Sequence, residues 1–568
     1  MKIVFKTLIW VLSLGFSPDL LGGVEINLES LEKHVRTDGR IKAWIYFTDK
    51  GDPARVLSRQ SQVRLSEKVI QRRAKVGIKG STWYDTPVNI DYIQSVLAGG
   101  ADLQQESRWL NAISVFSTLE ELSAIAELTW VKEIIPVFTH RRQIPEIEES
   151  KPEGINKSKS GPFDYGAALE QIEQINVQEA HTAGYFGQGV IVLILDTGFY
   201  TEHEVFDSLT IIATRDFIND DEIVSNEPGQ DVENQQNHGT YTFSALGGYA
   251  PGKLVSPAFK AEFILAKTER LEEEIQQEED DYVAALEWGE SLGADIVSSS
   301  LGYLDWYTFQ DLDGNTAVTT KAVDIAVSLG MVCVTAAGNE NGSSWNHIIA
   351  PADADSVISV GAVDRFGNIA SFSSRGPSAD GRIKPEVCAR GVATACATPS
   401  KLEYTNLNGT SLSTPLVAGA AALILSANPE WTPMMVREAL LITASKYLNP
   451  DNTYGWGIID VWTAINYDGF ETGTEDEKFI PELYSISRAY PNPFNPMVNF
   501  SVNIGTSGSV TLTVFNLLGQ PVENIYQGLL ARGLHKFRWN ASGRSTGIYF
   551  IHLESDEHSF MRKITYLK

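Results

Sequence analysis

Short, nearly unbroken apolar runs alternate with segments of helical spacing through the middle of this chain. Residues 189–195 (GVIVLIL) form one such run, and residues 294–298, 331–335 and 357–360 form three more. Runs of this kind are typical of strands that are buried on both faces, as in parallel sheets covered by helices. Residues 166–467 therefore predict an α/β domain with a doubly wound, mostly parallel sheet and helices on both faces.

The composition excludes several classes of protein. The chain has 568 residues, of which 43% are hydrophobic, so it can bury several packed cores. Its formal net charge of −27 makes a nucleic acid or an anionic bilayer a poor candidate partner. Three cysteines allow neither a disulfide framework nor a multi-cysteine metal site. Cys333 is expected in the core, whereas Cys388 and Cys396 could pair, which the sequence leaves open.

The first residues have the composition of an export signal. Lys2 and Lys6 flank the start of the apolar run 7–16, which is too short to span a bilayer. A buried first strand or helix is the alternative. We interpret residues 1–23 as a signal peptide. No later run has the length of a membrane span, so we expect a mature chain without a transmembrane segment, outside the cytoplasm.

Two polar stretches divide the rest of the chain. Residues 141–162 are rich in Glu, Lys, Ser, Pro and Gly, and residues 469–480 are acidic, so both are interpreted as linkers. They separate a small α+β unit at residues 24–140 from the α/β domain at residues 163–468. In residues 481–568, short alternating runs between turn signals predict a small all-β sandwich with antiparallel strands.

Three short blocks carry residues that can do chemistry. Asp196 ends the first apolar run, and a carboxylate at the carboxyl end of a parallel strand points toward the crevice where such sheets bind ligands. His238 opens a segment rich in small residues and can act as a general base near neutral pH. Ser411 begins an Ala-rich helix, where free N–H groups favour developing negative charge. Taken singly, each has a plainer reading as a turn, a loop histidine or a helix cap.

Taken together, the blocks and their order Asp, His, Ser resemble the subtilisin-like serine peptidases, or subtilases. The matching strings lie in residues 187–423 and read GQGVIVLILDTG, HGTYTFSALGG, ADIVSSSLGY, VTAAGNENG, ISVGAVD, SFSSRGP, KPEV and GTSLSTPLVAGAAAL, with YGWGIID following at residues 454–460. Leu412 and Ser413 stand where other residues are commoner in the family. Every chemical position of the pattern is filled.

The resemblance implies a role for each of these residues. Ser411 is the nucleophile, His238 the general base and then acid, and Asp196 the group that orients and stabilises the imidazolium. Asn339 matches the asparagine that stabilises the oxyanion, with the Ser411 backbone N–H as the second donor. The implied walls of the substrate pocket are Ser300, Leu301, Gly302, Ala336, Ala337 and Gly338. The side-chain preference is not readable from these walls, and our expectation is a broad preference that favours large uncharged residues.

The implied chemistry requires no cofactor. Subtilases often bind calcium, so a structural calcium ion is an open alternative for residues 311–315 (DLDGN), although a plain loop is the favoured interpretation and no metal ligand is assigned. A second acidic run at residues 272–281 is interpreted as a solvated surface segment.

The flanking units have resemblances of their own. Residues 24–140 resemble a subtilase propeptide, which implies a self-processing zymogen cleaved within residues 141–165, with a mature chain that starts near Phe163. Residues 481–568 resemble the C-terminal sorting domain of type IX secretion, on the strings YPNPFNP, VFNLLG and STGIYF. A carbohydrate-binding or spacer sandwich is the alternative for this last unit.

The sequence thus predicts a secreted serine endopeptidase that hydrolyses proteins through an acyl-enzyme. Its implied partners are protein or peptide substrates, its own propeptide and the type IX secretion machinery. Its expected destination is the medium or the outer cell surface, reached through the periplasm. Two alternatives stay open: a surface binding protein on a peptidase scaffold, which a substituted chemical position would have favoured, and a processing enzyme with a single target.

Overall fold

The structure is a computed structural model of the whole chain. It describes residues 31, 34–36, 38–137, 162–271, 277–469, 485–486, 489, 494–504, 508–516, 520–530, 533–555 and 559–566. The predicted signal peptide and, apart from residues 162 and 469, the two predicted linkers lie outside the described residues. The chain divides into two compact units, Met1–Val56 with Pro87–Val137 and Leu57–Thr86 with Phe138–Lys568.

The first unit has the α+β fold that the sequence predicts. Its four-stranded antiparallel sheet has the order β2-β3-β1-β4, formed by β1 (Arg40–Phe47), β2 (Asp102–Ser107), β3 (Ala112–Thr118) and β4 (Val131–Val137). Apolar side chains of α4 (Ile90–Ala98) and α5 (Leu119–Ala126) share one hydrophobic cluster with β1 and β3. The segment between β1 and α4 holds α2 (Pro53–Gln62), α3 (Glu67–Lys75) and η1 (Trp83–Asp85), and α3 and η1 belong to the second unit.

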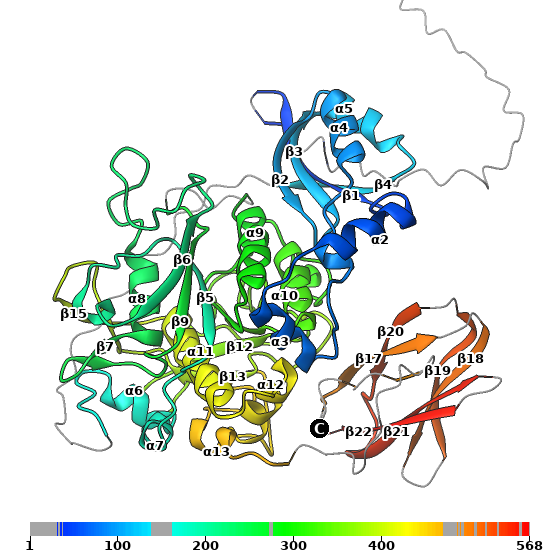
Figure 1. The fold of residues 1–568 in the computed structure, drawn as a ribbon. Helices are drawn as coiled ribbons and strands as arrows, with labels where there is room; N and C mark the ends of the chain where they lie inside the picture. The colour runs from blue at the N-terminus through cyan, green and yellow to red at the C-terminus, as the bar shows by residue number, and fades with distance from the viewer. Residues whose placement is uncertain are drawn as a thin grey trace, which may run out of the picture. The chain divides into compact units, whose positions relative to one another are not determined.

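The second unit contains the predicted parallel sheet (Figure 1). Seven strands lie in the order β13-β12-β11-β10-β5-β9-β6, and every neighbouring pair is parallel. The strands are β5 (Ile191–Asp196), β6 (Thr210–Asp216), β9 (Glu262–Lys267), β10 (Ile296–Ser299), β11 (Val332–Ala336), β12 (Ile358–Val363) and β13 (Val387–Arg390). The four apolar runs in the sequence correspond to β5, β10, β11 and β12.

Helices cover both faces of this sheet. A Cβ atom built on Gly289 of α9 (Gln277–Leu292) would lie 2.5 Å from Leu193 on β5. Val192 and Ile194, the neighbours of Leu193, instead share a cluster with α8 (Asn237–Gly247) and α11 (Thr410–Ala427). Since successive side chains of a strand point to opposite faces, α9 lies on one face and α8 and α11 lie on the other.

The strand order reverses at β5. From β5 the chain runs to β6 and β9 on one side of the sheet, and then crosses to β10, β11, β12 and β13 on the other. Ligands of open parallel sheets bind at the carboxyl ends of the strands where this reversal occurs. Asp196 is the last residue of β5, so the fold places this carboxylate at that point.

Smaller elements complete the second unit. They are α6 (Leu169–Gln174), α7 (Val177–Thr182), η2 (Glu204–Phe206), β7 (Tyr249–Ala250), β8 (Leu254–Val255), η3 (Phe309–Asp311), α10 (Val318–Ser328), β14 (Thr394–Ala397), β15 (Tyr404–Leu407), α12 (Pro433–Ile442) and α13 (Val461–Ile465). Cys333, Cys388 and Cys396 are buried and free, so Cys388 and Cys396 do not form a disulfide. Among the described helices, α11 alone is long and apolar enough to cross a membrane, but 83% of it is buried, as expected of a core helix.

The C-terminal residues form two antiparallel sheets. One consists of β16 (Ser485–Ile486), β17 (Met497–Ile504) and β20 (Gly533–Asn540), and the other of β18 (Gly508–Asn516), β19 (Pro521–Leu530), β21 (Gly547–Ser555) and β22 (Ser559–Tyr566). The members of its buried cluster all fall within residues 486–566. This confirms the predicted all-β fold of the C-terminal unit.

Candidate active site

Asp196 and His238 form a hydrogen-bonded pair at the carboxyl end of β5. Asp196 is fully buried, and His238, in the first turn of α8, keeps 15% of its side chain exposed. His238 Nδ1 lies 2.6 Å from Asp196 Oδ1. Because the carboxylate accepts the Nδ1 proton, Nε2 is left as the nitrogen that can accept a proton from a substrate or nucleophile.

Two further groups hold the Asp196 carboxylate in place. The Thr197 backbone N–H donates to Oδ1 over 2.8 Å, and the Thr242 hydroxyl donates to Oδ2 over 2.9 Å. A buried carboxylate needs such partners to offset its lost hydration. Burial lowers the pKa of His238, but the adjacent Asp196 carboxylate outweighs it and raises this pKa above its ordinary value. The pair therefore favours a protonated imidazolium.

Ser411 is the second residue of α11, at the free N-terminus of an 18-residue helix. Gly409 precedes the helix with φ of 151°, a backbone conformation that residues with side chains rarely adopt. The Ser411 hydroxyl donates to the Ser300 carbonyl over 3.4 Å. In the described part of the chain, no hydrogen bond joins Ser411 and His238. Catalytic hydrogen bonds are often long in ligand-free sites and tighten when substrate binds.

A proline in α11 leaves the Ser411 carbonyl without its helical partner, and a residue beside β10 takes that place. Pro415 lies inside α11 and has no N–H to donate to the Ser411 carbonyl, four residues earlier. The Ser300 hydroxyl donates to this carbonyl instead, over 2.9 Å. Ser300 follows directly after β10, so this bond ties the start of the helix to the edge of the sheet.

Asn339 is oriented by the same turn. Its Oδ1 accepts hydrogen bonds from the backbone N–H and the hydroxyl of Thr410, both at 2.9 Å. This pattern fixes the amide so that Nδ2 is the remaining donor. A Cβ atom built on Gly409 would lie 3.7 Å from Asn339 Nδ2, so the free N–H groups lie beside the turn that carries Ser411.

The structure brings the two predicted wall segments side by side. Ser300, Leu301 and Gly302 follow β10, and β10 pairs with β11, Ser299 lying opposite Thr335. Ala336 ends β11, and Ala337 and Gly338 follow it, with Gly338 at φ of 106°. All ten residues predicted from the sequence therefore lie at the carboxyl ends of β5, β10 and β11 or on the adjoining α8 and α11. This fold and this arrangement of side chains are typical of a serine hydrolase.

The comparisons with known proteins identify the family. The sequence model described as "Subtilase family" matches residues 187–457. Subtilisin amylosacchariticus from Bacillus subtilis subsp. amylosacchariticus is 32% identical over 366 residues, covering 64% of this chain and 83% of the relative. Subtilisin E from Bacillus subtilis (strain 168) matches to the same extent. Subtilisin DY from Bacillus licheniformis is 36% identical over 304 residues, covering 53% of this chain and 97% of the relative. The chain belongs to the subtilase family and is a subtilisin-like serine endopeptidase.

The two flanking units also match known domains. The model described as "Peptidase S8 propeptide domain, Bacteroidota" matches residues 42–153, and that described as "Secretion system C-terminal sorting domain" matches residues 488–566. Together with the family, these matches make the protein a serine protease zymogen with its own propeptide and a type IX sorting domain, destined for secretion or the cell surface.

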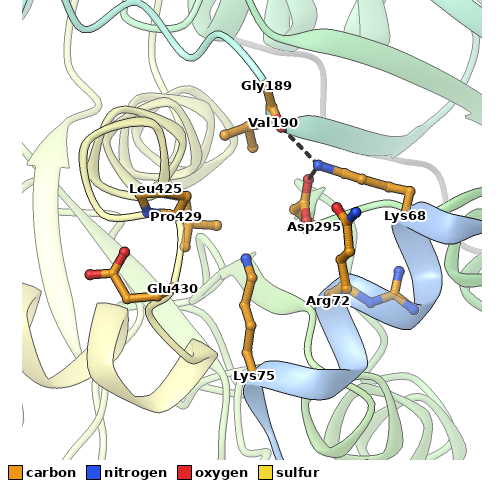
Figure 2. A pocket seen from close by; sticks show the side chains of 10 residues that line it. Lys68, Arg72, Lys75, Gly189, Val190, Asp295, Leu425, Pro429 and Glu430 are labelled. Carbon is orange, nitrogen blue, oxygen red and sulfur yellow. Dashed lines mark hydrogen bonds and ion pairs between the residues drawn. The ribbon is translucent and has the colours of Figure 1, made fainter. Parts of the chain in front are cut away.

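The propeptide contributes α3 to the unit that holds the peptidase fold. Figure 2 shows Lys68 pointing at the peptidase sheet, where its ammonium contacts the Gly189 carbonyl at 2.7 Å and Asp295 at 2.8 Å. Arg72 and Arg73 are almost fully buried, and both bind the carboxylate of Glu290 on α9. These ion pairs hold the propeptide helix against α9, remote in sequence from the predicted cleavage site.

The structure corrects the interpretation of the acidic run at residues 272–281 as a solvated surface segment. Of its described members, Glu278, Glu279, Asp280 and Asp281 are buried rather than solvated. Glu279 accepts hydrogen bonds from Trp306 Nε1 at 3.0 Å and from the Tyr307 hydroxyl at 2.7 Å. The charge run was misread because these partners come from a loop that follows β10, and sequence adjacency does not reveal them.

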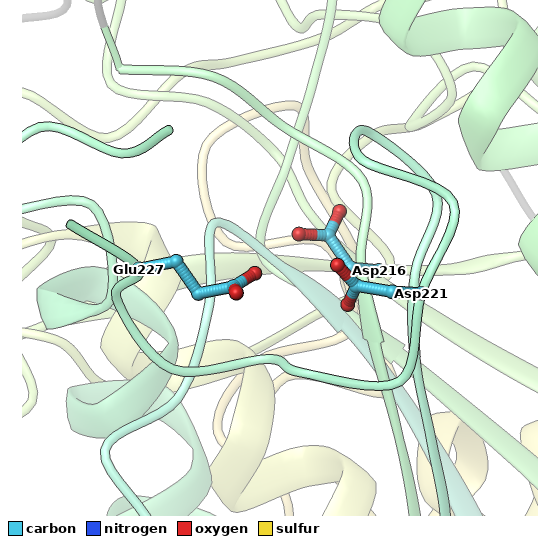
Figure 3. Close-up of side chains that lie close together, drawn as sticks. All are labelled: Asp216, Asp221 and Glu227. Atoms are coloured by element: carbon cyan, nitrogen blue, oxygen red, sulfur yellow. The ribbon is translucent and has the colours of Figure 1, made fainter. Parts of the chain in front are cut away.

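No metal site follows from the carboxylates of the described residues. In residues 311–315, Asp311 and Asp313 accept hydrogen bonds within their own turns, from the N–H groups of Thr308 and Thr316. Asp216, Asp221 and Glu227 do gather, with ligand atoms within 4.8 Å of one another (Figure 3). The Lys267 ammonium lies 2.7 Å from Asp216, so this side chain already compensates the negative charge of the Asp216 carboxylate.

Sequence reasoning missed some residues that support the site. Thr242 follows His238 by one helical turn, so its hydroxyl reaches the same carboxylate; the spacing on a helix was the available signal. Pro415 in an otherwise regular helix signalled an unpaired carbonyl at Ser411, but not that Ser300 would satisfy it.

Proposed function

We propose that this endopeptidase cleaves peptide bonds by acyl transfer to Ser411, with His238 and Asp196 completing a catalytic triad. The hydrogen bond of 2.6 Å between His238 and Asp196 is the observation that carries the proposal. It leaves Nε2 free to accept a proton, and α8 packs against α11, the helix that carries Ser411 in its first turn. His238 keeps 15% of its side chain exposed and Ser411 is also partly exposed, as expected of a base and a nucleophile that meet substrate.

The reaction proceeds in two halves. Ser411 Oγ bonds to the carbonyl carbon of the substrate while its proton passes to His238 Nε2. His238 then gives this proton to the amide nitrogen as the C–N bond breaks, which leaves an ester on Ser411. Water repeats the sequence: its oxygen bonds to the acyl carbon, its proton passes through Nε2 to Ser411 Oγ, and the ester bond breaks.

Asn339 Nδ2 and the Ser411 N–H stabilise the oxyanion in both halves of the reaction. The Thr410 bonds to Asn339 Oδ1 support this role because they fix the direction of the amide before substrate arrives. Preorganised donors of this kind act where charge develops, and losing one in subtilisin itself lowers turnover roughly 10²–10³-fold.

Maturation removes residues 24–140 by self-cleavage within residues 141–165. Phe163 supports a mature chain that starts near this residue, because its ring packs edge-on against Phe259 at 5.4 Å and against His181 at 5.8 Å. A chain end just before Phe163 would keep this aromatic cluster intact. The same proposal includes a propeptide at residues 24–140, a peptidase domain at residues 163–468, a sorting domain at residues 481–568 and export through the periplasm.

An intact-mass time course on the purified chain of residues 24–568 tests the proposal. The parent is expected to cleave itself within residues 141–165 and then to degrade casein, whereas Ser411→Ala stays whole and leaves casein intact. The matched control is Ser413→Ala, two residues further along α11, whose hydroxyl donates to the Thr410 carbonyl. In subtilisin, loss of the nucleophile lowers turnover about 10⁶-fold.

The outcome also separates the alternatives. Equal self-cleavage by Ser411→Ala and the parent would overturn the assignment of the nucleophile. A parent that neither matures nor degrades casein would favour the binding-scaffold alternative, and cleavage of one protein in a cell extract but not of casein would favour a dedicated processing enzyme.

A further inference from the structure

The space beside Ser411 that receives a substrate side chain lies between two glycines. Ser411 contacts Ser300 through both its hydroxyl and its carbonyl, and Asn339 directly follows Gly338. An acyl group bonded to Ser411, with its oxygen at Asn339, must therefore direct its side chain between the ends of β10 and β11. Gly302 and Gly338 stand on the two sides of this slot and contribute no side chains of their own.

The side chain of Ile349 lies beside both glycines of this slot. A Cβ atom built on Gly302 would lie 2.6 Å from Ile349 Cγ1, and one built on Gly338 would lie 3.1 Å from both Cγ1 and Cδ1 of the same residue. The same atoms thus contact both walls. Ile349 is 9% exposed, so it is packed in place rather than extended into solvent.

The backbone around Ile349 is bonded to both walls. The Ile349 N–H donates to the Ala337 carbonyl over 3.2 Å. Ala350 exchanges two hydrogen bonds with Tyr303, the residue after Gly302, at 2.8 and 3.0 Å. Because the segment is tied to each side of the slot, the backbone that carries Ile349 is held in place between the two walls. The Ile349 side chain forms the floor of the slot.

We propose that Ile349 determines specificity by filling the slot, so that the enzyme cleaves after small uncharged residues such as alanine or serine. This inference rests on the proposed acyl transfer to Ser411 and names its substrate class. It departs from the preference for large residues that the sequence led us to expect. The branched side chain leaves room for a methyl or hydroxymethyl group, and a phenyl or isobutyl group meets its γ- and δ-carbons.

The mature enzyme produced from the purified full chain tests this directly. The probes are tetrapeptide p-nitroanilides that differ only in the residue before the scissile bond, namely alanine, serine, leucine and phenylalanine. The parent is expected to cleave the alanine and serine substrates with a kcat/KM at least about tenfold above that of the phenylalanine substrate, since single methylenes in such slots change it by 10- to 200-fold.

Ile349→Ala is the matching variant. Removing three carbons from the floor is expected to raise the phenylalanine-to-alanine ratio of kcat/KM by about 10- to 200-fold. Ile349→Val, which removes one methyl group, should fall between the two. The control is Ile465→Ala on α13, also buried, whose carbonyl binds Asn428 at the far end of α11 from Ser411. It is expected to keep the parent's ratio.

The possible results are distinguishable. A parent that prefers phenylalanine or leucine to alanine overturns the inference while leaving the proposed function intact, and this holds even where a variant fails to fold. Ratios unchanged in Ile349→Ala, with kcat/KM for alanine preserved, overturn it as well. A parent that cleaves none of the four substrates and does not mature contradicts the proposed function instead.

Discussion

At the scale of single residues, the Asp196–His238 pair is expected to set the pH dependence of the enzyme. His238 must be neutral to accept the Ser411 proton, and Asp196 raises the pKa of His238 against the opposing effect of burial. Activity is therefore lost as the pH falls through a value above the ordinary histidine pKa of about 6.5. In Asp196→Asn, kcat is expected to fall about 10⁴-fold, as in another Ser-His-Asp protease, and the acidic limb to move to lower pH.

The profile of kcat/KM against pH, measured on a small peptide substrate, checks this prediction. Thr242→Val is the control, since it removes a hydrogen bond to Asp196 but keeps the carboxylate. It should lower kcat and retain most of the raised pKa. An acidic limb in the same place for Asp196→Asn and the parent would show that another group controls it.

The residues proposed to react could be named from the sequence, and the residue proposed to shape the slot could not. Asp196, His238, Ser411 and Asn339 occur in short strings whose residue types are dictated by the chemistry. Ile349 lies in a loop with no such string, and its effect depends on contacts with Gly302 and Gly338 that only the folded chain reveals. The sequence therefore predicts the reaction type more firmly than the side-chain preference, for which the proposed role of Ile349 depends on the folded chain.

At the scale of elements, apolar runs predicted the strands better than the helices. Strands β5, β10, β11 and β12 agree with the four predicted runs to within two or three residues at each end, whereas the buried strands β9 and β13 were not predicted. By contrast, residues 57–76 are polar and compatible with helix throughout, but α2 ends at Gln62 and α3 begins at Glu67, with Ser66 as its N-cap. Strands β2 and β19 were missed because their exposed, polar residues do not alternate cleanly with apolar ones.

Helix α3 is expected to control how long the propeptide stays bound after cleavage. Arg73 bonds to Asp85 at 2.6 and 2.7 Å and to Glu290 at 2.9 Å, with 1% of its side chain exposed. Breaking a buried ion pair from one side costs about 3–5 kcal/mol, because the partner charges are left without compensation. Arg73→Met should therefore weaken propeptide binding by roughly 10²–10³-fold.

The lag between self-cleavage and the onset of casein hydrolysis measures this release. Arg73→Met is expected to shorten the lag, and Arg55→Met, an exposed residue of α2, to leave it unchanged. A lag that is equal in all three proteins would mean that contacts other than those of α3 limit release.

Helix α7 carries a buried histidine that makes the peptidase fold sensitive to acid. His181 Nε2–H donates to the Pro257 carbonyl at 2.8 Å, and Nδ1 accepts from the Tyr165 hydroxyl at 2.9 Å. Burial lowers the pKa of His181 to about 4, against 6.5 for an exposed histidine. Between these values the unfolded chain binds the additional proton, so stability falls as the pH drops from about 6.5 to 4, by about 3 kcal/mol.

Urea unfolding between pH 4 and 7 in a Ser411→Ala background, which prevents self-digestion, measures this dependence. His181→Gln should flatten it by about 3 kcal/mol across the window. Tyr165→Phe removes one hydrogen bond but leaves the ring buried, so it should keep most of the slope. If His181→Gln and the parent have the same slope, other groups cause the acid sensitivity.

At the scale of the whole molecule, the organisation of the chain is a sequence of units that act at different times. The propeptide precedes the peptidase fold, and the sorting domain follows it, as their family matches show. Composition alone suggested these divisions, because the polar segments interrupt the apolar pattern. It could not reveal that Leu57–Thr86 joins the unit of the peptidase fold, since that depends on Arg72 and Arg73 meeting Glu290.

The C-terminal unit is expected to direct export without supporting catalysis. Its hydrophobic cluster is drawn entirely from residues 486–566, so its removal takes no side chain from the core around β5. A chain lacking residues 481–568 should therefore mature and degrade casein at the parent's rate, but remain in the periplasm. Cell fractionation with an antibody against the peptidase domain, together with casein hydrolysis by each fraction, measures both properties.

Two substitutions test whether export requires a folded C-terminal unit or only the presence of its sequence. Trp539 is 1% exposed, and its ring packs against Tyr549 at 5.0 Å and Phe494 at 5.6 Å. Trp539→Ala should therefore lower the stability of this unit by about 3–5 kcal/mol. The variant is expected to remain in the periplasm, like the truncated chain. Leu529 is 79% exposed, and Leu529→Ala should be exported normally. Export of the truncated chain would mean that the secretion signal lies elsewhere, whereas loss of casein hydrolysis on truncation would show that the tail supports the peptidase fold.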